Sequence, residues 1–395
     1  MLAHQIVLLL FIGYIVFSID KKQKYFPVPM VLVLLGILLS FISYFDSLKI
    51  TKEIIFNVFL PALLFTSAYQ FSLDSLKKNK WIIATLTTVG LMATAGLLGV
   101  AIYFISGPFL QISFVGALLI AAILTPTDPV SVVSILKQST GNEKIADIVE
   151  GESMVNDGTS IVIYSVLLTM YKSGESFSVG SFLGEFILVS AGGIILGIIF
   201  GWLLGRAVHY THHKQYQVML SIIVAYGSFH IAEKIGVSGV LATVTAGIML
   251  SWEFGKSEKE DYFHDSLDGF WNIVEPSVLA LIFLLIGIDA ADYLAFPGWV
   301  LAFIIFVLSL VVRFLVLAGF TSAVPAWRKN FSAGDVGLIT WSGIKGTMSV
   351  ALLLGLEAGV DNDNVLVSLT FAAILLSLVI QSVGVYPLTK EKEQS

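Results

Sequence analysis

Residues 150–158 read EGESMVNDG and run directly into the apolar stretch TSIVIYSVLLTMY, which ends at Tyr171. Glu152 and Asp157 therefore lie at the mouth of a segment that is apolar enough to cross a membrane. A charged group near the bilayer centre is costly, so it is usually retained for a function and faces the protein interior or water. A functional site is the first interpretation of this stretch.

Helical spacing groups the polar side chains of this stretch. At about 3.6 residues per turn, Ser153 and Asp157 lie one turn apart on one face, and Glu152 and Asn156 lie on the neighbouring face. Carboxylate, hydroxyl and amide oxygens are the ligands that a hard cation needs in place of its water shell. Alternatively, the stretch starts a cytoplasmic helix that Glu150, Glu152 and Ser153 cap. This alternative explains Glu150 better than Asp157.

The composition of the whole chain is typical of a membrane protein. Of the 395 residues, 56% are hydrophobic and only 13% are charged, and the mean hydropathy is +0.90. Soluble domains carry about twice that charged fraction. The net charge of −6 leaves no basic surface for nucleic acid. Because the chain has no cysteine, disulfides and cysteine-based metal sites or nucleophiles are excluded.

Thirteen apolar segments are candidate membrane spans, since each approaches or exceeds the length that crosses the hydrocarbon core, although the third and ninth are short. We expect an all-α polytopic membrane protein in a single transporter domain, without a soluble domain. The segments lie at residues 4–19, 27–44, 54–70, 81–106, 111–136, 146–171, 180–205, 216–232, 237–252, 270–288, 298–322, 335–356 and 364–386.

Basic residues support this count. Loops that follow odd-numbered segments hold 16 of the 22 Lys and Arg residues, and loops that follow even-numbered segments hold 4. Lys and Arg concentrate in cytoplasmic loops, and a missed or invented span would scramble the bias. The distribution predicts a protein of the cytoplasmic membrane with its amino end outside and its carboxyl end in the cytoplasm.

The fifth segment is interrupted by LTPTDPV, residues 124–130. Pro126 and Pro129 each lack a backbone donor and clash with the preceding turn, so a continuous helix is not expected here. Unwound backbone at membrane depth survives where it lines protein or a water-filled cavity, as in transporters. We expect Asp128 at the positive amino end of the second half-helix of this segment.

The twelfth segment has a similar interruption. The stretch WSGIKGTMS, residues 341–349, places Lys345 between two glycines inside an apolar run. The fifth and twelfth segments are an odd number of spans apart, so they run in opposite directions. Two six-helix repeats would then be inverted copies, with their broken helices crossing at mid-membrane, as expected for alternating access.

Arg313 lies deep in the apolar eleventh segment. A guanidinium stays protonated and requires a carboxylate partner when it is buried. Glu152 is the best candidate, which leaves Asp157 as the acid that can exchange its ligand. Alternatively, Arg313 extends to the membrane interface.

The motifs EGESMVNDG, TPTDPV, WSGIKG and FLPALLF (residues 59–65) occur together across nearly the whole chain. In this set the chain resembles the monovalent cation:proton antiporters, meaning bacterial NhaP- and NhaG-type sodium/proton antiporters and animal sodium/hydrogen exchangers. The resemblance implies the thirteen-helix inverted-repeat fold, a homodimer and electroneutral exchange. It also implies a dimerisation part at roughly 1–70 and 180–290 and an ion-translocation core at roughly 81–171 and 298–386.

The resemblance also assigns roles by position. Asp157 would bind the monovalent cation or the proton, assisted by Asn156, Ser153 and Thr127. Glu152, Arg313, Asp128 and Lys345 would compensate charge or hold the structure.

Two positions depart from the family pattern. Thr66 stands where the family often has a carboxylate, and we place it among the ion-binding residues. Lys345 stands where the family usually has arginine.

These observations predict a secondary antiporter, not an enzyme. A monovalent cation, Na⁺ or Li⁺ with K⁺ as the alternative, would exchange for H⁺ one for one, without a cofactor. A carboxylate in a dehydrated site is costly to keep charged, so proton and cation would compete for Asp157. The rival interpretations are a cation channel and an intramembrane aspartyl protease that uses Asp128 and Asp157.

Overall fold

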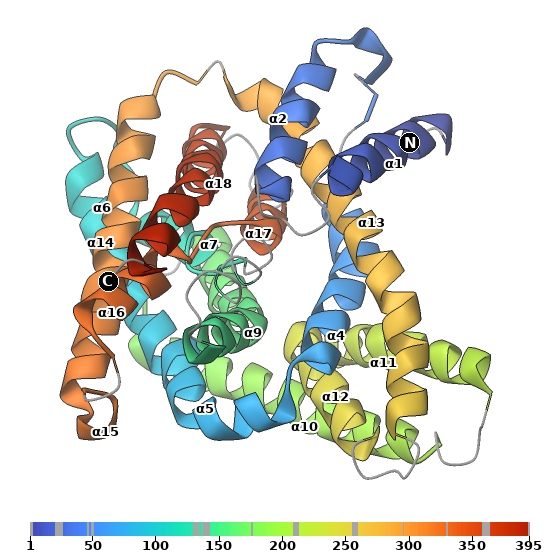
Figure 1. Ribbon diagram of the computed structural model, residues 1–395. Coiled ribbons are helices and arrows are strands. Elements are labelled where there is room, and N and C mark those ends of the chain that lie inside the picture. Colours follow the sequence, from blue (N-terminus) through green and yellow to red (C-terminus); the bar gives the residue numbers. More distant parts are fainter. Residues whose placement is uncertain are drawn as a thin grey trace.

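The computed structural model describes most of the chain, and the described residues form helices and their connections, without a strand (Figure 1). The described residues are 3–19, 27–45, 47–48, 51–128, 133, 136, 143–174, 177–207, 213–254, 260–294, 296–328, 331–357 and 364–393.

The helices follow the apolar segments of the sequence. In chain order they are α1 (Ala3–Ile19), α2 (Val28–Ser40), the 3₁₀ turn η1 (Ser43–Phe45), α3 (Lys52–Ile54), the π-helical turn η2 (Ile55–Phe59), α4 (Leu60–Gln70), α5 (Leu73–Thr85), the π-helical turn η3 (Leu86–Gly90), α6 (Leu91–Ser106), α7 (Phe114–Ile123), α9 (Glu143–Ser173), α10 (Val179–Ala207), α11 (Lys214–Ile235), α12 (Gly239–Phe254), α13 (Glu260–Leu294), α14 (Trp299–Ala323), α15 (Pro325–Arg328), α16 (Ala333–Trp341), α17 (Thr347–Glu357) and α18 (Asn364–Glu393).

The lengths and compositions of these helices are those of a multi-pass membrane protein. Within the described ranges, seven helical stretches are long and apolar enough to cross a bilayer by themselves, and five apolar helices are shorter. The all-α fold is therefore confirmed. The count of thirteen crossings stays a prediction. The five shorter helices, and α9 with its polar start, are not among the helices that are long and apolar enough to cross a bilayer.

Most of the longer helices fall into two groups (Figure 1). One group contains α4, α10, α11, α12 and α13, in which α12 contacts α4, α10 and α11. The other contains α6, α7, α9, α14, α16, α17 and α18, in which α7 contacts α6 and α9, and α14 contacts α16 and α18. Helix α9, which carries the acidic motif, contacts both groups.

A close glycine contact fixes the position of α13 against α2. A Cβ atom added to Gly36 would lie 2.8 Å from the Gly287 Cα, and one added to Gly287 would lie 2.7 Å from the Gly36 Cα. Real Cβ atoms do not approach this closely, so both positions require glycine for the two backbones to meet. The contact therefore holds α13 closely against α2.

Both predicted interruptions are present. Helix α7 ends at Ile123, and residues 126–128 have no regular secondary structure; Pro129 lies outside the described residues. Helix α16 ends at Trp341, and α17 begins only at Thr347. Proline in one segment and paired glycines in the other account for the loss of regular helix at these points.

Candidate functional site

The two unwound segments meet directly. The Asp128 backbone N–H donates to the Ile344 carbonyl at 2.8 Å. A Cβ atom added to Gly346 would lie 2.2 Å from Asp128 Oδ2, and one added to Gly343 would lie 2.7 Å from Arg313 Nε. Glycine at both positions therefore lets the charged side chains approach the second unwound segment. The crossing satisfies backbone groups that the missing helical turns would otherwise leave unpaired.

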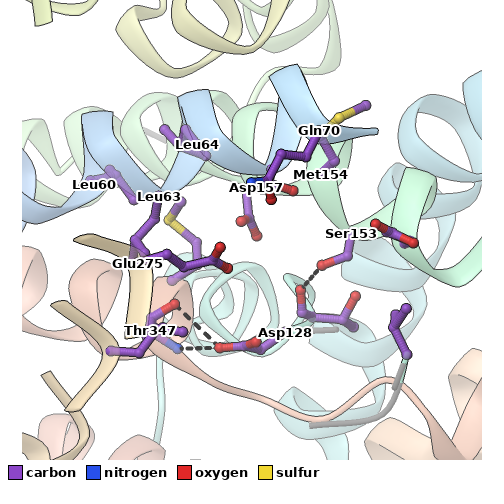
Figure 2. Close-up of a pocket in the computed structure, with 16 residues that line it drawn as sticks. Leu60, Leu63, Leu64, Gln70, Asp128, Ser153, Met154, Asp157, Glu275 and Thr347 are labelled. Atoms are coloured by element: carbon purple, nitrogen blue, oxygen red, sulfur yellow. Dashed lines mark hydrogen bonds between the residues drawn. The ribbon is translucent and has the colours of Figure 1, made fainter. Parts of the chain in front are cut away.

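The carboxylate of Asp128 caps the helix that follows the other break. Asp128 Oδ2 accepts from the Thr347 backbone N–H at 3.2 Å and from the Thr347 hydroxyl at 3.3 Å (Figure 2). The sequence predicted Asp128 at the amino end of the half-helix in its own span, and of that half only residues 133 and 136 are described. The described contact is with α17, because the crossing places Asp128 beside the first residue of that helix.

Two side chains of α9 hold the first unwound segment. Asn156 Nδ2 donates to the Thr127 hydroxyl at 2.8 Å, and the Thr127 N–H reaches Asn156 Oδ1 at 3.5 Å. The Ser153 hydroxyl donates to the Thr127 carbonyl. All three residues are buried. The structure therefore brings Thr127, Ser153 and Asn156 together through hydrogen bonds with one another, and their role in ion binding stays a prediction.

A cavity of about 380 Å³ lies beside this crossing. Its lining comes from both groups of helices and includes several acidic and hydroxyl side chains (Figure 2). The lining residues are Leu60, Leu63, Leu64, Ser67 and Gln70 of α4; Thr127 and Asp128 of the first break; Val133, which follows that break; Glu150, Ser153, Met154 and Asp157 of α9; Glu275 and Leu279 of α13; and Thr347 and Met348 of α17.

Asp157 points into this cavity (Figure 2). Its Oδ1 atom is buried and makes no hydrogen bond within the described part of the chain. A buried polar atom without a partner is costly, and such atoms usually bind water or an ion. Asp128 lies within electrostatic reach and adds a second negative charge. The site therefore has the character of a cation-binding or proton-binding site.

The second acid of the motif has a different environment. Glu152 Oε2 accepts from Arg313 Nη2 at 2.8 Å, and both side chains are buried. The predicted ion pair is therefore confirmed. Lys345 is also buried, within electrostatic reach of both partners, and its backbone N–H donates to the Ser377 hydroxyl at 3.0 Å.

Thr66 and Glu275 differ most from the sequence analysis. Thr66 is buried, its hydroxyl donates to the Ala62 carbonyl of its own helix at 2.8 Å, and its neighbour Ser67 lines the cavity instead. Glu275 lines the cavity but was not predicted. The available signal was an acid directly before Pro276, inside the apolar segment 270–288.

Comparisons with known proteins agree with this architecture. The family model described as "Sodium/hydrogen exchanger, transmembrane" matches residues 6–391. Among structures, the sodium proton antiporter MjNhaP1 from Methanocaldococcus jannaschii superimposes with a TM-score of 0.78 at 19% identity, covering 98% of this chain and 97% of that chain. At this identity the likeness concerns the fold alone.

Two curated relatives are similar over most of their lengths. The Na⁺/H⁺ antiporter NhaP of Pseudomonas aeruginosa is 30% identical over 347 residues, which cover 86% of this chain and 81% of the relative. The Na⁺/H⁺ antiporter NhaH of Halobacillus aidingensis is 30% identical over 403 residues, covering 98% of this chain and 97% of the relative.

Proposed function

Because the chain belongs to the sodium/hydrogen exchanger family, we propose that it exchanges a monovalent cation for a proton across a membrane, with Asp157 as the group that binds either one. Sodium or lithium is the proposed cation and potassium the alternative. Relatives that are named Na⁺/H⁺ antiporters match this chain over most of its length, which supports the assignment.

One observation carries the proposal. Asp157 presents a buried carboxylate oxygen without a hydrogen bond to the described residues, at the edge of a cavity that borders two unwound segments. Of the other two acids of the same motif, Glu152 is paired with Arg313, and Glu150 also has an interaction partner. Asp157 is therefore the acid of the motif that is available for a mobile ligand.

Competition at this carboxylate provides the coupling. Burial disfavours an unpaired negative charge, so either a proton or a cation stabilises Asp157, and each excludes the other. Ser153 and Thr127 supply neighbouring oxygen atoms that suit a hard cation. If the transport step is easy only when Asp157 is neutralised, an inward proton gradient drives cation efflux without ATP.

The position of the cavity between the two helix groups supports a mechanism of alternating access. One wall comes from α4 and α13, within the proposed dimerisation part (1–70 and 180–290). The other comes from α9, α17 and the first break, within the proposed core (81–171 and 298–386). Rocking of the core against the other part would expose Asp157 to each side of the membrane in turn.

The decisive experiment replaces Asp157 by asparagine. Everted membrane vesicles that contain the wild-type protein should show dequenching of a pH-sensitive fluorophore on addition of sodium or lithium, and D157N should show none. E185Q, which changes an exposed acid of α10, is the matched control and should behave as wild type. Retained exchange in D157N would refute the assignment of Asp157. Parallel runs with potassium identify the preferred cation.

The homodimer and the orientation of the termini stay part of the proposal. The distribution of Lys and Arg residues supports an outside amino end and a cytoplasmic carboxyl end. Protease accessibility of tags at the two termini in everted vesicles would test the orientation. Sedimentation of the purified protein in detergent would test the dimer.

A further inference from the structure

Glu275 brings a second carboxylate to the cavity from the wall opposite Asp157. It lies on α13 and is partly buried, and Figure 2 shows its carboxylate turned toward the space below Asp157. Apart from Ser67 and Gln70, the other residues that α4 and α13 contribute to the lining are leucines. Within the described lining, Glu275 is thus the one charged group on a largely apolar wall.

The placement of Glu275 is fixed by its own helix and its neighbours. Gln70 Nε2 of α4 donates to Asn272 Oδ1 of α13 at 3.0 Å, about one turn before Glu275. On the other side of Glu275, the contact between Gly36 and Gly287 holds α13 against α2. Pro276 follows Glu275 within the helix and removes one backbone donor beside the cavity.

The acids around the cavity differ in how they are occupied. Asp128 caps α17 through Thr347, and Glu150 also has an interaction partner. Within the described chain, by contrast, the side chain of Glu275 makes no hydrogen bond or ion pair, and Asp157 Oδ1 is buried and makes no hydrogen bond. Asp128 and Glu150 lie within electrostatic reach of Glu275, so the neighbouring charges are negative.

Two carboxylates without a cationic partner are stable in such a cavity only when a cation or a proton neutralises them. A space of about 380 Å³ is large enough for a cation that keeps part of its water shell. We propose that Glu275 is a second ligand for the transported monovalent cation, which it binds together with Asp157 across the cavity. This inference rests on the antiport proposed for the same cavity.

The position of Glu275 on the wall opposite the core predicts a specific role. When the core moves, Asp157 carries the cation with it, whereas Glu275 stays behind on α13. Glu275 therefore contributes to cation binding while the cavity is open. It does not contribute to the translocation step. Its loss should change the apparent KM for the cation and leave the maximal rate nearly unchanged.

The test uses E275Q in everted vesicles, with the exposed α10 variant E185Q as matched control. Loss of one charged ligand should raise the apparent KM for sodium by about tenfold, while the maximal rate stays within about twofold of wild type. E185Q should change neither quantity. An unchanged KM, or a reduced maximal rate with an unchanged KM, would overturn the proposal.

A relocated carboxylate separates a ligand from a structural role. Ser67 of α4 lies on the same wall, so the double variant S67E/E275Q should recover part of the lost affinity. A purely structural glutamate would not be rescued in this way. Should E275Q fail to fold, E275D decides: it keeps the charge but withdraws it from the cavity, so the KM should rise, and an unchanged KM would overturn the proposal.

The same vesicles distinguish the two proposals. If wild type shows no cation-dependent proton movement, the antiport itself is refuted. If wild type is active, D157N is inactive and E275Q is indistinguishable from wild type, only the role of Glu275 is refuted.

Discussion

Glu152 and Asp157 lie on the same helix, little more than one turn apart, and yet their surroundings are opposite. Glu152 Oε2 forms an ion pair with Arg313 Nη2 at 2.8 Å, and the cavity beside this pair measures only about 20 Å³. Asp157 has a buried oxygen without a hydrogen bond to the described residues, and it faces a cavity of about 380 Å³. One acid is thus paired with a buried cation, and the other has an oxygen without a hydrogen-bond partner in the described chain.

This difference shows that two acids on one membrane helix can contribute differently to the stability of the protein. The ion pair of Glu152 is stable only while both partners remain, because removing one strands the other as a buried charge. The carboxylate of Asp157 has no such partner, so the binding of either a cation or a proton would stabilise it. The comparison therefore predicts that stability and transport depend on different acids.

The largest expected effect comes from breaking the ion pair. E152Q leaves the Arg313 guanidinium buried without its counter-charge and should lower the free energy of unfolding by about 3–5 kcal/mol. D157N removes an unpaired acid and should change it by less than about 1 kcal/mol. Thermal unfolding of both purified variants in detergent measures the difference. Equal melting temperatures would contradict the division between a structural and a mobile-ligand acid.

The next effect concerns the crossing that both acids border. Alanine at Gly346 would place its Cβ 2.2 Å from Asp128 Oδ2, so G346A should push the carboxylate away from Thr347 and destabilise the protein by about 1–3 kcal/mol. The matched control is G337A, on α16, where an added Cβ meets no atom within 4 Å and should stabilise the helix by up to about 1 kcal/mol.

Melting temperatures and vesicle transport together test this crossing. G346A should also slow exchange, because Asp128 and Thr127 lie on the cavity lining with Asp157. If G346A and G337A unfold at the same temperature and transport equally, the close approach of Asp128 to the second break does not stabilise the protein.

The sequence predicted those features of the site that follow from local rules. Prolines predict where α7 ends, and glycines inside an apolar run predict the break before α17. A buried guanidinium requires an acid, so the pairing of Arg313 with Glu152 could be predicted from the sequence alone. Each of these inferences needs only the chemistry of the residues themselves and the knowledge that they lie in a membrane.

The remaining features depend on long-range packing. The contact of Asp128 with Thr347 exists only because two breaks more than 200 residues apart cross each other. Glu275 faces Asp157 because the Gly36–Gly287 contact and the Gln70–Asn272 hydrogen bond orient α13. No periodicity within α13 specifies which neighbour its acid meets. The thirteen-span count and the roles of the site residues stay predictions.

The smallest expected effect concerns two consecutive hydroxyl residues of α4, Thr66 and Ser67, which point in different directions. Successive helical residues point about 100° apart, so Thr66 bonds to its own helix while Ser67 lines the cavity. S67A should raise the apparent KM for sodium by about two- to threefold, whereas T66V should change it by less than about twofold. Initial rates of sodium-dependent dequenching in vesicles measure both. A larger effect of T66V would instead make the Thr66 hydroxyl the cation ligand that the sequence predicts, and it would require α4 to turn toward the cavity during transport.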